Sequence, residues 1–231
     1  MKCIVSLLSF ILLLLPPLVS GSNVTECVNI PTAEVADYGI GELKVRVYTG
    51  GGIITRFVFS PFARICFGGS LDVEKFIGYE TPEVHEPAFY FKWKVFDGAK
   101  IFPAVAVGYD GQGYNFVNKS YLFPPKGIFL TFSQNVLLEK LFVDLGVNLS
   151  KYKEETKMFG FLSTRFTLEE LVNLAVEWEN IGGENDIQRV NLELGLILAK
   201  VVKVDLLLIN LNKGTENIER QVRINYNYKF L

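Results

Sequence analysis

The chain contains a single histidine, His85, in the run ETPEVHEPA, where carboxylates stand at Glu83 and Glu86. An imidazole beside carboxylates could act as a general base in a hydrolase or bind a metal ion. A metal site needs more ligands than this loop segment supplies, so we expect a solvent-exposed loop histidine. We predict no catalytic, cofactor-binding or metal-binding residue, and no enzyme activity.

Charged residues elsewhere recur at alternate positions of short apolar segments, which places them on one face of a strand. In a closed barrel that face lines the lumen, where charges pair across the interior or create a transverse field. We favour a mostly filled lumen, with a narrow open pore as the alternative. The predicted lumen-facing charges are Lys44, Arg46, Arg56, Arg64, Asp72, Lys92, Lys94, Asp144, Glu177, Glu179, Arg189, Glu193, Lys203 and Asp205.

Cys27 and Cys66 could form a disulfide, because both are predicted to lie at the same end of the barrel. Such a bond would be stable in an oxidising periplasm and would pin the N-terminal segment into the barrel mouth. Two free thiols are the alternative.

The N-terminus resembles a secretory signal peptide. Lys2 is followed by an apolar stretch of about a dozen residues, and the small residues Ser20 and Gly21 suit cleavage after Gly21. An N-terminal membrane anchor is the alternative. Downstream, no window reaches the roughly 18 apolar residues of a spanning helix. We therefore expect a signal peptide over 1–21, a periplasmic or lumen-associated segment over 22–39, and a barrel over 40–231.

The rest of the chain reads as alternating segments separated by turn residues, which is typical of antiparallel strands. Leu141, Val143 and Leu145, set against Asp144 and Gly146, are a clear example. The predicted strands are 43–48, 53–59, 64–73, 88–96, 104–109, 127–135, 141–151, 157–166, 171–180, 189–199, 202–211 and 222–230. Residues 167–178 also fit a helical spacing, so ten strands remain an alternative to twelve.

Three features favour an all-β, antiparallel, up-and-down transmembrane barrel over a soluble β-sandwich. The apolar faces are large, while the opposite faces mix charges with small residues. The connections alternate between long ones, averaging about ten residues, and short ones of about four, as in bacterial barrels. Aromatic residues gather near strand ends, as an interfacial girdle requires: Tyr48, Phe59, Phe89, Trp93, Tyr109, Trp178, Tyr226, Tyr228 and Phe230.

Composition agrees with a β-rich envelope protein. Phe (19) and Tyr (10) are abundant, which suits strands, and the net charge of -2 with no basic run argues against a nucleic-acid partner.

The C-terminal run VRINYNYKF resembles the last strand of bacterial outer-membrane barrels, an aromatic-rich signal that the barrel-assembly machinery reads. Its apolar face consists of Val222, Ile224, Tyr226, Tyr228 and Phe230; Leu231 departs from the usual terminal Phe. The resemblance implies a bacterial outer-membrane location, with outer-membrane lipid and that machinery as partners.

The runs PTAEVADYGIGELKVRVY, GGGIITRFVFSPFARICFGGSLDVEKFIG, FYFKWKVFDG and PAVAVGYDGQGY are similar to the YjbH-like group of outer-membrane barrels. That resemblance implies a role linked to exopolysaccharide export, with polysaccharide or envelope proteins as further partners. We therefore predict a non-enzymatic barrel with a structural or transport role. The alternatives are a barrel enzyme acting on lipid or glycan, and a secreted soluble β-sandwich binding protein.

Overall fold

The computed structural model describes residues 24–117, 120–137, 140–152, 155–169, 171–185, 187–198 and 201–231. The predicted signal peptide over 1–21 lies outside these residues. Helix is confined here to two short 3-10 turns, η1 (Leu211–Lys213) and η2 (Thr215–Asn217), and no described helix is long and apolar enough to cross a membrane.

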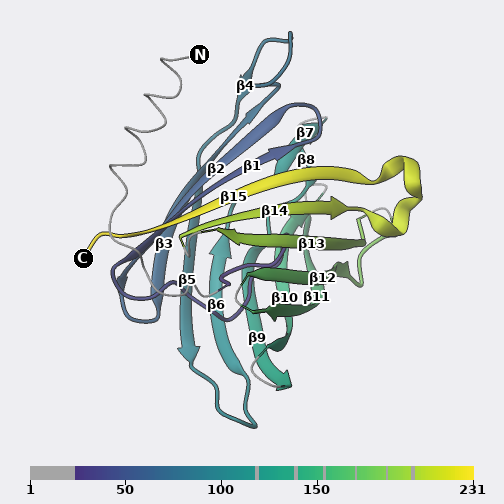
Figure 1. The fold of residues 1–231 in the computed structure, drawn as a ribbon. Coiled ribbons are helices and arrows are strands. Elements are labelled where there is room, and N and C mark those ends of the chain that lie inside the picture. The colour runs from purple at the N-terminus through teal and green to yellow at the C-terminus, as the bar shows by residue number, and fades with distance from the viewer. Residues whose placement is uncertain are drawn as a thin grey trace.

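Twelve long strands form one antiparallel sheet that closes on itself (Figure 1). Neighbours in the sequence pair around the ring, and β1 closes it by pairing with β15 on one side and β2 on the other. The long strands are β1 (Ile40–Tyr48), β2 (Gly52–Phe62), β3 (Ile65–Glu74), β5 (Ala88–Phe96), β6 (Ala104–Asp110), β9 (Gly127–Leu137), β10 (Leu141–Tyr152), β11 (Glu155–Leu168), β12 (Val172–Ile181), β13 (Arg189–Leu198), β14 (Val202–Ile209) and β15 (Glu219–Lys229).

The predicted fold class is confirmed, because each of the predicted segments overlaps one of these strands. Residues 172–181 form strand β12, so the helical alternative for this segment is wrong. Three short strands were not predicted, and all lie in the long connections: β4 (Glu83–Val84) pairs antiparallel with the end of β3, while β7 (Tyr114–Val117) and β8 (Ser120–Phe123) form a separate hairpin. We call the end of the barrel that carries these connections the long-loop end.

The two faces of the wall have opposite polarity. Outward residues of β10 are apolar and open, with Leu145 49% and Leu149 44% exposed, while inward Asp144 is fully buried and Asn148 is 2% exposed. A soluble protein would reverse this arrangement. Closure also pairs every strand edge of the ring. A sheet that spans a membrane needs this, because lipid offers no hydrogen-bond partner to unpaired backbone groups. The described wall therefore has the polarity of a transmembrane barrel.

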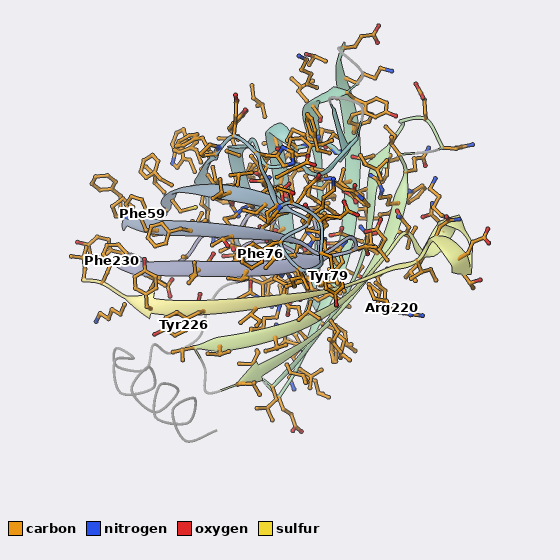
Figure 2. The ribbon with its side chains drawn as sticks, turned by 90° about the horizontal axis from the view of Figure 1, so that it is seen from above. Phe59, Phe76, Tyr79, Arg220, Tyr226 and Phe230 are labelled. Carbon is orange, nitrogen blue, oxygen red and sulfur yellow. The ribbon has the colours of Figure 1, made fainter. Side chains whose placement is uncertain are left out.

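Aromatic rings cover the outside of the wall where β15, β1, β2, β3 and β5 lie side by side. Phe57 stacks on Tyr228 with ring centroids 6.0 Å apart, and Phe59 meets Phe230 at 6.2 Å. Figure 2 shows Phe59, Tyr226 and Phe230 on this part of the surface. The apolar residues of the proposed assembly signal therefore face outward. The girdle prediction is wrong for Tyr48, which is 4% exposed and points inward.

Gly41 on β1 creates the space in which the Tyr228 ring lies, since a Cβ at this position would sit 2.2 Å from Tyr228 Cζ. We expect Gly41→Ala to lower the free energy of unfolding by about 1–3 kcal/mol, measured by urea unfolding in detergent. In a Tyr228→Ala background the same change should cost much less. Gly69→Ala is the matched control, because its Cβ would meet nothing closer than Ala88 O at 3.5 Å. Equal costs at Gly41 and Gly69 would contradict this packing account.

Candidate functional site in the barrel lumen

The N-terminal segment runs through the lumen and narrows it. We call residues 24–36 the plug; among them Cys27, Ile30 and Thr32 have no exposed surface. The plug is irregular apart from one bridge between Glu26 and Pro31. It contacts inward side chains from opposite sides of the ring, which is possible only for a segment enclosed by the wall.

Lumen side chains satisfy the buried backbone of the plug. Lys92 Nζ donates to the carbonyl oxygens of Thr25 at 2.6 Å, Thr32 at 3.1 Å and Glu34 at 2.6 Å. On the facing side, Glu177 accepts from the amides of Asn29 and Ile30. Buried backbone groups without such partners would be costly. These charges therefore position a peptide segment and do not line a free channel.

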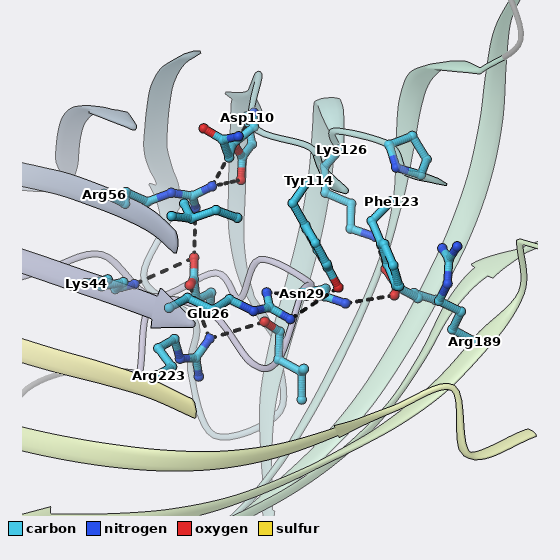
Figure 3. Close-up of a pocket in the computed structure, with 16 residues that line it drawn as sticks. Glu26, Asn29, Lys44, Arg56, Asp110, Tyr114, Phe123, Lys126, Arg189 and Arg223 are labelled. Atoms are coloured by element: carbon cyan, nitrogen blue, oxygen red, sulfur yellow. Dashed lines mark hydrogen bonds and ion pairs between the residues drawn. The ribbon is translucent and has the colours of Figure 1, made fainter. Parts of the chain in front are cut away.

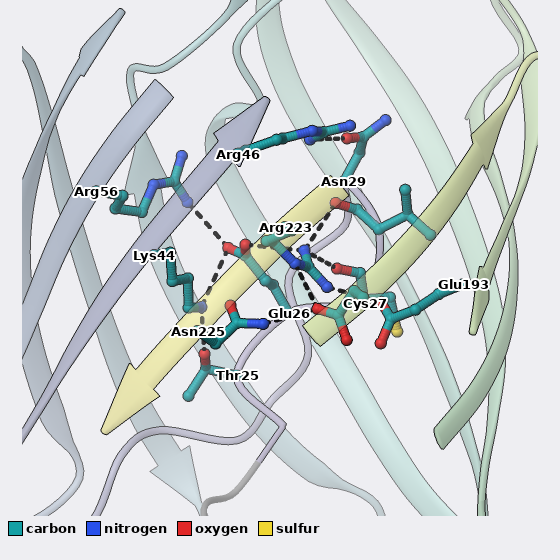
Figure 4. Close-up of polar contacts among 12 residues, drawn as sticks. Thr25, Glu26, Cys27, Asn29, Lys44, Arg46, Arg56, Glu193, Arg223 and Asn225 are labelled. Atoms are coloured by element: carbon teal, nitrogen blue, oxygen red, sulfur yellow. Dashed lines mark hydrogen bonds and ion pairs between the residues drawn. The ribbon is translucent and has the colours of Figure 1, made fainter. Parts of the chain in front are cut away.

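Arg223 on β15 is the centre of the network and is 3% exposed. Its guanidinium donates to Asp205 at 2.8 Å and Glu193 at 2.7 Å in the wall, and to the carbonyl of Cys27 at 2.7 Å in the plug (Figure 4). One side chain thus joins two strands of the wall to the plug, a geometry that the planar five-donor guanidinium suits.

Glu26 is the acidic counterpart of Arg223 in the plug. Its carboxylate lies 3.3 Å from Arg223, 3.0 Å from Arg56 and 3.6 Å from Lys44. Burial alone would raise the pKa of the Glu26 carboxyl, but these three cations hold that pKa well below its usual range. Glu26 is therefore a fixed negative charge between three strands of the wall.

The two cysteines do not pair. Both are free and buried, so the predicted disulfide between Cys27 and Cys66 is wrong and the alternative of two thiols holds. Cys27 Sγ lies 3.2 Å from Ser163 Oγ, whereas Cys66 packs in an apolar cluster with Val35. Burial and then the Asp144 carboxylate raise the pKa of the Cys27 thiol, which keeps it unreactive.

A pocket lies on the side of the plug that faces the long-loop end (Figure 3). One wall is a ladder of four side chains. Tyr114 and Phe123 stack with centroids 4.2 Å apart, the guanidinium of Arg46 lies 4.7 Å from the Tyr114 ring centroid, and that of Arg189 lies 4.0 Å from the Phe123 ring centroid. We call these four residues the arginine–aromatic ladder.

The pocket carries a positive charge. Its lining has six basic side chains and three carboxylates, a net charge of +3, from Lys44, Arg46, Arg56, Lys126, Arg189 and Arg223 against Glu26, Asp110 and Glu179. Within the described chain, Arg46 and Arg189 form no ion pair with a carboxylate: Arg46 donates to Gln221, Asn29 and Tyr114, and Arg189 to backbone carbonyls. These two guanidiniums retain the most capacity to bind an added anion.

A second pocket lies on the other side of the plug, toward the end of the barrel at which β15 ends. Glu26, Lys44 and Arg223 line both pockets, so they form the partition between them. The pocket volumes are about 60 Å³ on the long-loop side and about 40 Å³ on the other, room for only a few water molecules each.

All of the predicted lumen-facing charges project inward except Arg64, for which the prediction is wrong. Arg64 lies in the turn between β2 and β3 with φ 69°, is half-exposed, and pairs with Asp97. Like the lumen charges described above, Lys94 and Lys203 have structural partners: Lys94 binds Glu34 of the plug at 2.7 Å, and Lys203 binds Glu193 of the wall. The prediction missed Glu26, Glu42, Lys126, Arg165 and Arg223, although Arg165 and Arg223 alternate with apolar residues just as the predicted charges do.

The expectation of a solvent-exposed His85 is also wrong. Its side chain is 14% exposed, lies against the Phe116 ring at 4.8 Å, and approaches Glu74 at 3.5 Å. The carboxylate that approaches the imidazole therefore belongs to Glu74 of strand β3, and not to Glu83 or Glu86 in the loop of the histidine.

The similar solved structures have low sequence identity to this chain. The KdgM porin is 14% identical, with a TM-score of 0.48, over 83% of this chain and 99% of that one, and the same values hold for "KdgM porin in complex with disordered oligogalacturonate". The Acinetobacter baumannii outer membrane protein Omp33 is 7% identical, with a TM-score of 0.45, over 84% of this chain and 99% of that one. No family model and no curated protein matches the sequence, so the resemblance to the YjbH-like group gains no support.

Proposed function

We propose that this protein is a non-enzymatic barrel of the bacterial outer membrane that admits small anionic solutes through its long-loop end. The observation that carries the proposal is the net positive pocket above the plug, with two guanidiniums that have no carboxylate partner in the described chain. The apolar outer wall supports the membrane location.

The arginine–aromatic ladder suits anions that carry a carboxylate or phosphate group, and acidic saccharides are one such class. A guanidinium fork binds a carboxylate or phosphate through two parallel hydrogen bonds. The two rings between Arg46 and Arg189 are covered on their faces by each other and by the guanidiniums, so they hold the two guanidiniums in place at the pocket. Units of an acidic exopolysaccharide fit this description, so the exopolysaccharide link implied by the YjbH-like resemblance stays part of the proposal.

Assembly belongs to the same proposal. Val222, Ile224 and Tyr228 face away from the lumen on the last strand. We infer that the barrel-assembly machinery reads this outward face before the strand pairs with β1.

Selectivity is the test of the proposed solute class. Each Arg→Glu exchange changes the charge by two, so Arg46→Glu with Arg189→Glu takes the pocket from a net +3 to −1. We expect the reversal potential in a KCl gradient across a planar bilayer to change sign, from anion-selective to weakly cation-selective.

The control for this experiment is Arg220→Glu, an exposed position at the long-loop end of β15 (Figure 2). It alters the total charge without entering the pocket and should leave the reversal potential nearly unchanged. A double variant that keeps the native selectivity would refute the assignment of the pocket as the selective region.

A further inference from the structure

Three potential metal ligands meet at the long-loop end, outside the pocket described above. Asp72 and Glu74 are alternate residues on the inward face of β3, and His85 follows β4. One ligand atom from each of the three lies within 4.8 Å of the others. Because two of these residues come from a strand and the third from the loop that returns to it, the cluster is invisible in the sequence around His85.

The backbone holds this cluster in place. Strand β4 pairs with the end of β3, with Val84 opposite Val73 and Glu83 opposite Glu74. The next amide, His85 N, donates to Asp72 O at 3.0 Å. The imidazole is packed against Phe116 of the β7–β8 hairpin, and Glu74 accepts a hydrogen bond from the Phe116 amide. The three side chains are thus fixed by paired strands and a packed hairpin, as a preorganised site requires.

Two polar atoms of the cluster have no hydrogen-bond partner in the described chain. Asp72 has no exposed surface; its Oδ1 accepts from Tyr48 at 2.8 Å, and its Oδ2 is buried without a partner. His85 Nε2 is likewise buried and unpartnered, 3.5 Å from Glu74 Oε2 but without hydrogen-bond geometry. Buried polar atoms in native proteins are nearly always paired, so two unpaired atoms in one cluster call for a missing ligand.

We propose that Asp72, Glu74 and His85 bind a divalent transition-metal ion. One imidazole nitrogen with two carboxylates is a donor set of Zn²⁺ or Mn²⁺, whereas Ca²⁺ and Mg²⁺ prefer oxygen alone. Three protein ligands leave at least one position for water. The ion would link His85, which follows β4, to Asp72 and Glu74 on β3. Because His85 and Glu74 both contact Phe116, it would also stabilise the position of the β7–β8 hairpin at the mouth of the barrel.

The first test is calorimetric titration of ZnCl₂ into the detergent-solubilised full chain, purified without a histidine tag and stripped with a chelator. We expect one Zn²⁺ per chain for the native protein. His85→Gln removes the only imidazole of the chain. The affinity should fall at least about tenfold, because losing a residue that only orients a metal ligand already costs about 10- to 100-fold, and His85 would bind the ion directly. Asp72→Asn should have an effect of the same size.

Glu83→Gln is the matched control, because Glu83 lies two residues before His85 and pairs with Lys75 on the exposed surface. It should bind Zn²⁺ like the native chain. Cobalt gives a second readout: a visible absorption band of bound Co²⁺ should appear with the native protein and be lost in His85→Gln. If Asp72→Asn fails to fold, His85→Gln in the loop still decides the question. No stoichiometric Zn²⁺ binding by the native chain, or equal affinity in native and His85→Gln proteins, would overturn the proposal.

Discussion

Arg223→Ala is expected to lower the stability of the folded barrel by about 3 kcal/mol, because it leaves buried carboxylates without their main cation. Asp205 and Glu193 would each lose a hydrogen bond shorter than 2.9 Å, and the Cys27 carbonyl would lose its donor. Lys203 still contacts both carboxylates, at 2.5 Å to Glu193 and 3.0 Å to Asp205, which keeps the loss near the low end of the range for a broken buried pair.

The measurement is urea unfolding in detergent micelles, followed by the shift between the folded and unfolded bands in gel electrophoresis. Arg220→Ala is the matched control, since Arg220 lies three residues earlier on the same strand with an exposed side chain. Its effect should stay within about 0.5 kcal/mol. If the two variants unfold at the same urea concentration, Arg223 is not the centre of the lumen network.

Deletion of the plug, residues 24–36, is expected to raise single-channel conductance by about an order of magnitude. A barrel of twelve strands lies between the filled eight-stranded and the conducting sixteen-stranded types, so its contents decide whether it conducts. With the plug in place, the pockets on either side are only about 60 and 40 Å³ and are separated by Glu26, Lys44 and Arg223. Without it, water can hydrate the released Lys92 and Glu177 side chains.

Planar-bilayer recording of the native and shortened chains gives this comparison. Removal of residues 211–217, the exposed η1–η2 connection, serves as the control for a deletion as such. That change leaves the plug intact and should not widen the channel. Equal conductance of the native and plug-deleted proteins would mean that residues 24–36 do not obstruct the path.

The ring of strands was predictable because a membrane barrel repeats one rule along the whole chain. Each strand alternates between lipid and lumen, and the alternation in segments such as 141–151 and 189–199 is nearly free of errors. The alternation of long and short connections then indicates which strand ends lie at the same end of the barrel. Arg64 was placed wrongly because it lies in a turn, with φ 69°, where the period-two rule no longer applies.

The candidate sites were less predictable, since they depend on contacts between distant segments. The plug has no hydrophobic periodicity that would predict its structure. Its position depends on side chains such as Lys92 and Arg223, which from the sequence could equally have lined a water-filled channel. Whether Cys27 meets Cys66 or Ser163 depends on how far the plug extends across the lumen. Asp72 and His85 come together only through the β3–β4 pairing, which the sequence does not signal.

The central claim is that apolar side chains of the wall contact lipid while charged ones are enclosed. The chain has two tryptophans, Trp93 on β5 and Trp178 on β12, nearly opposite each other around the ring. Both point outward, with exposed fractions of 45% and 43%. Emission excited at wavelengths that tryptophan absorbs and tyrosine does not, from the protein reconstituted into vesicles, therefore reports on the outer wall alone. Lipids brominated along their acyl chains should quench most of this emission, and iodide in the aqueous phase should quench little. Strong iodide quenching without quenching by brominated lipid would contradict the account.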